Sequence, residues 1–149
     1  MEVRRITDSE KETEEFARQI AQVLIDKNVI ITMHGELGAG KTAFVRGFAK
    51  GLGFDENVTS PTFTIMNSYN KEKDLYHFDM YRLSSRDELV ELGLEEYLDK
   101  RTLVGISIIE WPENIGYNNG DIKITINKLG DSKREYILEA EDAGYLYGV

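Results

Sequence analysis

One glycine-rich segment narrows the possible folds of this chain more than any other part of it. The segment reads Gly35-Glu36-Leu37-Gly38-Ala39-Gly40-Lys41-Thr42 and matches the pattern G-x-x-x-x-G-K-T. Such glycines let the backbone fold around phosphate oxygens, and the N–H groups of the loop and of the next helix supply positive potential. The β-branched run 29–33 predicts a buried strand before the segment, and residues 43–50 predict a helix after it. The sequence therefore predicts a P-loop, which binds the phosphates of ATP or GTP.

Two side chains of this segment carry most of the expected chemistry. Lys41 is expected to reach the β- and γ-phosphates, and the Thr42 hydroxyl is expected to bind Mg²⁺. The rest of the segment, together with Ala43, is expected to surround the nucleotide. The sequence contains no N/TKxD motif of the kind that recognises guanine, which favours ATP over GTP.

Acidic residues stand at two predicted strand ends, where a P-loop site needs a carboxylate. Glu110 ends the hydrophobic run 104–109, and Asp79 follows the run 75–78. Because ligands bind outside the carboxyl ends of parallel strands, both acids are expected at the same crevice. One would hold Mg²⁺ and the other would orient the attacking water, but their spacing leaves open which does which. Asp79 and Glu110 are therefore both predicted as metal ligands and, with Lys41, as catalytic residues.

Weaker candidates lie near these residues. Thr62, in the polar turn Ser60-Pro61-Thr62, is either a sensor of the γ-phosphate or part of an ordinary turn. Trp111, the only tryptophan, either stacks near the nucleotide or covers the core. The two histidines, His34 and His77, are expected to be packed residues rather than proton carriers.

Hydrophobic periodicity and turn residues outline the remaining elements. Helices are expected over 9–27, with Asp8 or Ser9 as N-cap, and over 86–98, with Ser85 as N-cap; strands are expected over 62–68, 75–80 and 104–109; a hairpin is expected from 122–126 and 135–139. Strands linked by crossover helices predict one α/β domain over residues 1–149. We expect a P-loop NTPase-like, mixed but mostly parallel sheet flanked by helices, with a C-terminal antiparallel hairpin.

Composition limits the possible partners. The chain has 27 acidic and 18 basic residues, a net charge of −9, and no cysteine. The overall field repels nucleic acid, so stable direct binding to RNA or DNA is not expected. No stretch approaches the roughly 20 apolar residues of a membrane span, and a cytoplasmic location is expected.

Five motifs in a fixed order give a more specific interpretation. They read GELGAGKTAFVRGFAKGLG, VTSPTFTIMNSY, YHFDMYRL, ELVELGLEEYL and IIEWPENI. Together they resemble the TsaE family, also known as YjeE, over about residues 5–140. The resemblance implies a small ATPase of bacterial tRNA threonylcarbamoyladenosine (t6A) synthesis. Because the sequence shows no obvious arginine finger for the phosphates, hydrolysis by the chain alone is expected to be weak. By resemblance, such a protein binds ATP and Mg²⁺. It acts on the TsaB–TsaD complex, which transfers the threonylcarbamoyl group to adenosine 37 of tRNA.

The resemblance also implies roles for individual residues. Lys41, Thr42, Asp79 and Glu110 would serve nucleotide, metal and hydrolysis, and Trp111 would lie at the nucleotide site. Glu10 and Thr13 of the early helix, and Arg134 of the late hairpin, would flank the base.

Two other functions stay open on the sequence alone. A small-molecule kinase also begins with a P-loop, but the sequence shows no pair of arginines typical of a kinase lid. A nucleotide-sensing module without required catalysis is the second alternative.

Overall fold

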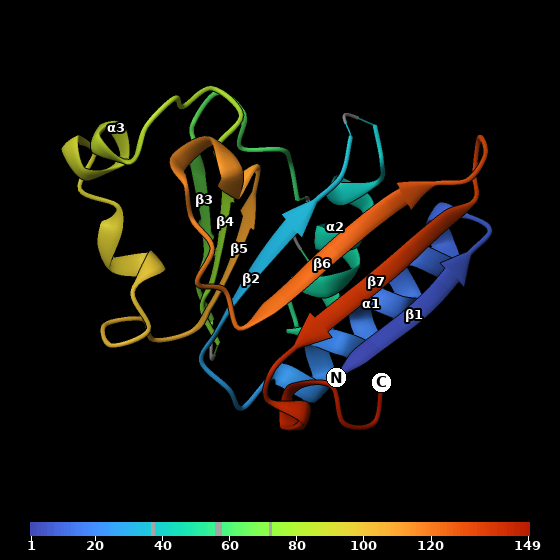
Figure 1. Ribbon diagram of the computed structural model, residues 1–149. Coiled ribbons are helices and arrows are strands. Elements are labelled where there is room, and N and C mark those ends of the chain that lie inside the picture. Colours follow the sequence, from blue (N-terminus) through green and yellow to red (C-terminus); the bar gives the residue numbers. More distant parts are fainter. Residues whose placement is uncertain (37, 56–57, 72) are drawn as a thin grey trace.

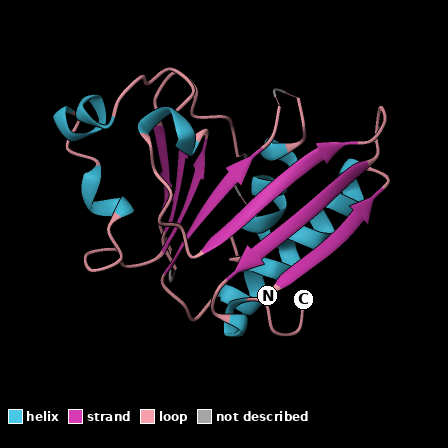
Figure 2. Cartoon of the chain, viewed as in Figure 1, coloured by secondary structure: helices cyan, strands magenta, loops and turns pink. Residues whose placement is uncertain are grey.

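The computed structural model describes residues 1–36, 38–55, 58–71 and 73–149. In these ranges the chain forms a seven-stranded sheet in the order β1-β7-β6-β2-β5-β4-β3. The strands are β1 (Glu2–Thr7), β2 (Val29–His34), β3 (Met66–Tyr69), β4 (Leu75–Asp79), β5 (Ile106–Glu110), β6 (Ile122–Lys128) and β7 (Arg134–Ala140). The α-helices are α1 (Glu10–Leu24), α2 (Lys41–Gly51) and α3 (Arg86–Glu91), and the 3₁₀ turns are η1 (Glu95–Leu98), η2 (Pro112–Ile115) and η3 (Ala143–Tyr145). Figure 2 shows the helices on both faces of the sheet.

The centre of the sheet is parallel and its margins are antiparallel. Strands β6, β2, β5 and β4 run in the same direction, whereas β7 and β1 on one side and β3 on the other run against their neighbours. The carboxyl ends of the parallel strands therefore meet at one edge, the upper edge in Figure 1. The predicted α/β fold, with a parallel core and a C-terminal hairpin, is confirmed.

Alternating side chains divide the core between the two faces of the sheet. On one face α1 and α2 pack together over Ile31, Ile108 and Ile124, which belong to the larger core cluster. The right-hand half of Figure 1 shows these two helices behind β6, β7 and β1. On the opposite face Phe78 and Ile109 pack with residues of α3 and η1.

The aromatic contacts between α1, α2 and β7 join the P-loop helix to the antiparallel half of the sheet. Phe44 of α2 stacks on Tyr136 of β7 with ring centroids 5.6 Å apart, and Phe16 of α1 lies 5.8 Å from the same tyrosine ring. All three side chains are almost fully buried. Such aromatic pairs add stability beyond the area they bury, so α2 is held firmly in place.

One strand was not predicted, and several predicted boundaries were wrong. Strand β1 was not predicted, because five of its six residues are partly or fully exposed and its sequence does not alternate cleanly. The strand expected over 62–68 begins only at Met66, because Ile65 has a φ of 68° and its N–H bonds back to the Pro61 carbonyl at 2.6 Å.

The other two corrections depend on glycine. The helix expected over 86–98 ends at Glu91, because Gly93 has a φ of 72°, and the chain continues as the separate turn η1. The strand expected from Val104 begins at Ile106, since Gly105 has a φ of 122° and Val104 is 72% exposed. None of the helices within the described ranges combines the length and apolar character needed to cross a membrane.

The close approach of α1 and α2 makes a stability prediction. A Cβ atom at Gly47 would lie 2.2 Å from the Glu14 carbonyl oxygen. For Gly47→Ala, the helix-propensity gain of about 1 kcal/mol is smaller than an overpacking cost of about 3 kcal/mol, so we expect a net loss near 2 kcal/mol. Urea unfolding followed by circular dichroism measures this change. Gly130→Ala, where the nearest atom would be the Lys133 Cβ at 3.8 Å, is the matched control. Equal stability of the two variants would contradict the prediction.

Candidate functional site

A pocket of about 280 Å³ opens at the carboxyl edge of the parallel strands. Its lining comes from the P-loop, both helices on that face, the loop before β3 and the ends of β4 and β5. The lining residues are Glu10, Gly38, Gly40, Lys41, Thr42, Ala43, Arg46, Ser60, Thr62, Asp79, Glu110 and Trp111. Most of the residues expected from the sequence are thus brought to one place.

The two predicted acids lie side by side because of strand register. Asp79 is opposite Glu110 in the parallel pair β4–β5, and Glu110 is opposite Met33 in the pair β2–β5. Asp79 is 4% exposed and Glu110 is 5% exposed. Both carboxylates therefore lie close to the end of the strand that leads into the P-loop.

Asp79 is held by donors on both of its oxygens. The Thr62 hydroxyl donates to Oδ2 at 2.7 Å, and the backbone N–H of Tyr81 donates to Oδ1 at 2.9 Å. The Thr62 hydroxyl also lies 2.7 Å from that of Ser60. The loop before β3 is therefore connected directly to an acid of the site.

Lys41 has little contact with solvent. Its amine donates to the Gly35 carbonyl at 2.6 Å and lies 4.0 Å from the centroid of the Trp111 ring. Burial lowers the pKa of this amine, and the nearby carboxylates of Glu110, Asp79 and Glu113 oppose that shift. A cation with few solvent contacts gains strongly from an anionic ligand.

The P-loop keeps its shape through backbone conformations and one arginine. Gly38 and Gly40 have φ values of 77° and 101°, which other residues adopt only with strain. The Arg134 guanidinium donates to the Ala39 carbonyl at 3.0 Å and to the Gly38 carbonyl at 3.4 Å. The loop thus depends on a side chain from β7, 95 residues after Ala39 in the chain.

Some predicted site residues do not line this pocket. Thr13 is 2% exposed, and its hydroxyl bonds to Thr7 at 2.7 Å and accepts from the Tyr136 hydroxyl at 3.2 Å. Ala39 is buried, and Glu36 is exposed but does not line the pocket. Leu37 lies outside the described residues. Gly35 and Arg134 act on the P-loop itself through the contacts given above.

Trp111 reaches the pocket through an uncommon backbone conformation. Its φ is 56°, and Pro112 follows at the start of η2. The indole ring lies 5.2 Å from the Tyr81 ring and faces the Lys41 amine. Trp111 lines the pocket and also packs against the core cluster that contains Phe78 and Ile109.

Sequence reasoning missed three residues at this site. Ser60 and Arg46 line the pocket, and Arg46 donates to the Glu14 carboxylate at 3.0 Å. The spacing of Arg46 four residues after Thr42 on one helix was an available signal. His77 is packed, as expected, with 0% exposure, but its Nε2 also lies 2.5 Å from Oε2 of Glu110.

The donor set of the pocket fits Mg²⁺. Carboxylate and hydroxyl oxygens are the ligands that this ion prefers, and it commonly takes only one or two of them beside substrate phosphates and water. Thr42, Asp79 and Glu110 supply such oxygens. No cluster of three or more histidine, cysteine or acidic side chains arranged for a metal occurs in the described ranges.

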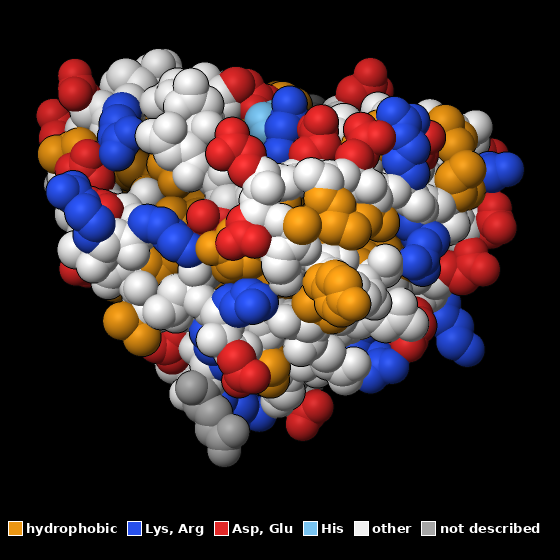
Figure 3. All heavy atoms as spheres, turned by 60° about the horizontal axis from the view of Figure 1, so that its bottom comes forward, with side chains coloured by type: hydrophobic (Ala, Val, Ile, Leu, Met, Phe, Trp, Pro, Cys, Tyr) orange, Lys and Arg blue, Asp and Glu red, His pale blue; other side chains and the backbone are white. Residues whose placement is uncertain are grey.

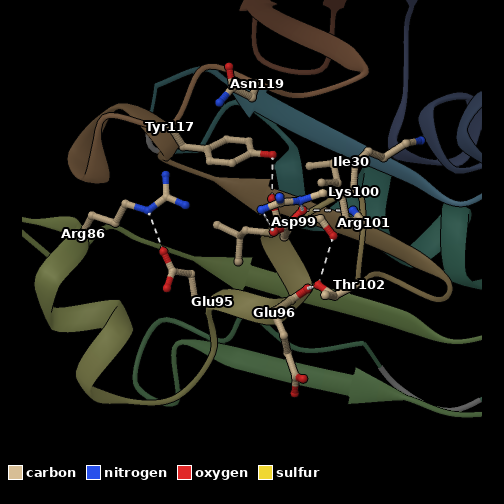
Figure 4. A pocket seen from close by; sticks show the side chains of 11 residues that line it. Ile30, Arg86, Glu95, Glu96, Asp99, Lys100, Arg101, Thr102, Tyr117 and Asn119 are labelled. Carbon is tan, nitrogen blue, oxygen red and sulfur yellow. Dashed lines mark hydrogen bonds and ion pairs between the residues drawn. The ribbon is translucent and has the colours of Figure 1, made fainter.

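A second hollow of about 630 Å³ lies near the start of β2, away from the P-loop. Figure 4 shows charged side chains in its wall paired with one another: Arg86 with Glu95 at 3.2 Å and Arg101 with Asp99 at 2.8 Å. Tyr117 donates to the Leu98 carbonyl at 3.1 Å.

On the lower face of the molecule, Figure 3 shows acidic and basic side chains interspersed, unlike a continuous basic surface. These features favour the P-loop pocket as the functional site.

Comparison with known proteins gives consistent results. A family model described as "Threonylcarbamoyl adenosine biosynthesis protein TsaE" matches residues 7–136. The chain is 35% identical over 135 residues to the tRNA threonylcarbamoyladenosine biosynthesis protein TsaE of Treponema pallidum, with 89% of this chain and 97% of that protein covered. It is 42% identical over 114 residues to the protein of the same name from Bacillus subtilis, with 74% and 69% covered. The crystal structure of Bacillus subtilis YdiB superposes with a TM-score of 0.75 at 32% identity, covering 98% of this chain and 90% of that one.

The contacts of Arg134 make a prediction about the loop. Arg134→Met keeps the apolar stem but removes the donors to the Ala39 and Gly38 carbonyls. Hydrogen bonds from charged groups contribute about 1.5 kcal/mol or more, so we expect ATP to bind roughly ten-fold more weakly. Isothermal titration calorimetry measures the dissociation constant. Arg101→Met, whose side chain is 88% exposed and paired with Asp99, is the control. An unchanged affinity in Arg134→Met would show that the arginine does not support the loop.

Proposed function

The chain belongs to the TsaE family, and we propose that it serves tRNA threonylcarbamoyladenosine biosynthesis as a Mg²⁺-dependent ATPase that acts on the TsaB–TsaD complex. The observation that carries this proposal is the convergence of Lys41, Thr42, Asp79 and Glu110 on one pocket. The names of the relatives support the pathway, and the chemistry of the pocket supports the activity.

Lys41 would provide the fixed positive charge for the triphosphate. Its amine has little water around it and a pKa lowered by burial, so phosphate oxygens would be favourable partners. The N–H groups at the start of α2 add further positive potential. Neither group has to rearrange far, since the amine already lies 2.6 Å from a carbonyl of the loop.

Thr42, Asp79 and Glu110 would hold the metal and orient the attacking water between them. When bound, Mg²⁺ neutralises charge on the β- and γ-phosphate oxygens. The Thr62 and Tyr81 donors keep the Asp79 carboxylate in one orientation. Thr62 would also carry information outward, because its hydroxyl touches Asp79 while the next residue, Phe63, is 80% exposed.

Slow hydrolysis by the isolated chain follows from the same geometry. Within the described lining, Arg46 is the only arginine, and the Glu14 carboxylate already holds it at 3.0 Å. An arginine donated by a partner supplies about 10³–10⁵ in rate in related chemistry. The net charge of −9 suits a partner protein with a basic surface better than it suits RNA.

The two acids give the first test. In Glu110→Gln and in Asp79→Asn the shape is kept and the charge is removed, so ATP hydrolysis should fall by at least about 10²-fold. ATP should still bind, because Lys41 and the loop are intact. Glu141→Gln removes an equal charge from an exposed site after β7 and is the control. Parent rates in both acid variants would refute their assigned roles. Loss of hydrolysis with full t6A formation would instead favour a sensing module.

The partner gives the second test. Association with purified TsaB–TsaD should be strongest in ATP, weaker in ADP and weakest without nucleotide, and repeated t6A formation should require this chain. Lys41→Ala loses a charge-assisted contact of about 1.5–3 kcal/mol, so its response to ATP should need ~10–100-fold more nucleotide. Pull-down assays and t6A yield over several turnovers measure these effects. Equal association in all three states, with t6A made repeatedly in the absence of this chain, would contradict the proposal.

A further inference from the structure

We infer that His77 is a positioning residue for Glu110, an inference that rests on the proposed function. Both side chains project from the face of the sheet that α1 and α2 cover. On β4, His77 lies two residues before Asp79, and on β5 its register partner Ile108 lies two residues before Glu110. Because side chains alternate along strands, His77, Asp79 and Glu110 share one face. The histidine therefore lies directly beneath the two acids.

The contact between the two residues is short and buried. Nε2 of His77 lies 2.5 Å from Oε2 of Glu110, and the two side chains are 0% and 6% exposed. An ionised carboxylate, the form in which Glu110 would hold a metal, can only accept hydrogen bonds, so with that form Nε2 of His77 is the donor. A hydrogen bond to a charged group is stronger in a site with little water. This bond fixes one oxygen of Glu110 and leaves the other for metal or water.

The second nitrogen of the ring indicates that stability alone does not explain His77. Nδ1 is the one buried side-chain nitrogen or oxygen without a hydrogen-bond partner in the described ranges. A buried polar atom without a partner is destabilising. An aliphatic residue, such as its buried neighbour Leu75 on the same face, would avoid that cost. The feature that histidine adds at this position is the Nε2 donor.

Glu110 and Asp79 also differ in how they are held. Donors from Thr62 and Tyr81 hold Asp79, and both lie in segments outside the strands of the site. In the described ranges His77 is the hydrogen-bond partner of the Glu110 carboxylate. Removal of His77 should therefore affect Glu110 and leave Asp79 in place.

Three substitutions separate positioning from packing. His77→Gln can present a side-chain N–H near the position of Nε2, His77→Asn places its N–H nearer to Nδ1, and His77→Leu has no donor. Loss of a residue that orients a metal ligand typically lowers metal affinity or activity about 10–100-fold. We expect kcat to fall at least ~10-fold in His77→Leu and His77→Asn. In His77→Gln, kcat should stay close to that of the parent. KM for ATP should stay within about three-fold of the parent, since the P-loop is unchanged.

Two readouts do not depend on turnover. The affinity for Mn²⁺ in the presence of ATP, measured by electron paramagnetic resonance, should weaken about ten-fold in the Leu and Asn variants. The affinity for ATP in EDTA, followed by the fluorescence of Trp111, should not change. Ser107→Ala removes a buried hydrogen bond to the Tyr97 carbonyl from the opposite face of β5 and controls for lost stability.

A double-mutant cycle completes the test. In a Glu110→Gln background, His77→Leu should add little further loss, because the residue through which it acts is already changed. Parent Mn²⁺ affinity and kcat in His77→Leu, or equal behaviour of the Gln and Asn variants, would overturn the inference. If His77→Leu does not fold, the comparison of His77→Gln with His77→Asn tests the inference instead. If the parent itself neither binds Mn²⁺ with ATP nor hydrolyses ATP, the proposed function fails and the inference fails with it.

Discussion

The parallel pairing of β5 with both β2 and β4 is the constraint on which the rest of the site depends. Through these two registers Glu110 lies between Met33, just before the P-loop, and Asp79. A shift of either β4 or β5 by one residue would turn the side chains of that strand to the other face. The acid at its end would then leave the P-loop side, and the contact of His77 with Glu110 would be lost. The hydrophobic residues that set this register, such as Ile31 and Ile108, are therefore as important to the site as the acids.

The antiparallel half of the sheet supports the P-loop from the other side. Tyr136 and Arg134 lie two residues apart on β7: the tyrosine ring packs against Phe44 of α2, and the arginine donates to carbonyl groups of the loop. The tyrosine hydroxyl would lie 3.4 Å from a Cβ atom at Gly40. Strand β1 covers the outer edge of β7 and brings Thr7 to the buried hydroxyl of Thr13. The C-terminal hairpin thus takes part in the site, although it contributes no lining residue in the described ranges.

The charged side chains of the site lie close together and are almost fully buried. Lys41, Asp79 and Glu110 are each 6% exposed or less. Lys41 contacts a carbonyl of the loop, Asp79 accepts from two donors, and Glu110 contacts a histidine. Burying charged groups is costly unless they are paired, so these partners are required for the pocket to exist. In such a site electrostatic interactions are stronger than in water, and groups that are already held in place need little reorganisation.

The glycine-rich segment before α2, the α/β class, most strands and the acids at the ends of β4 and β5 could all be predicted from the sequence. These features depend on local patterns: glycine spacing, β-branched runs and the residue that ends each run. The family followed from the order of five motifs. Local patterns carry no information about partners far along the chain. Only the tertiary structure showed that Arg134 reaches the loop, that His77 contacts Glu110 and that Thr13 is buried under Tyr136. It also decided where glycine and Ile65 interrupt expected elements, because backbone conformations there depend on packing. Local hydrogen bonding and periodicity depend on neighbouring residues. The contacts of Arg134, His77 and Thr13 instead join segments that meet only when the sheet forms.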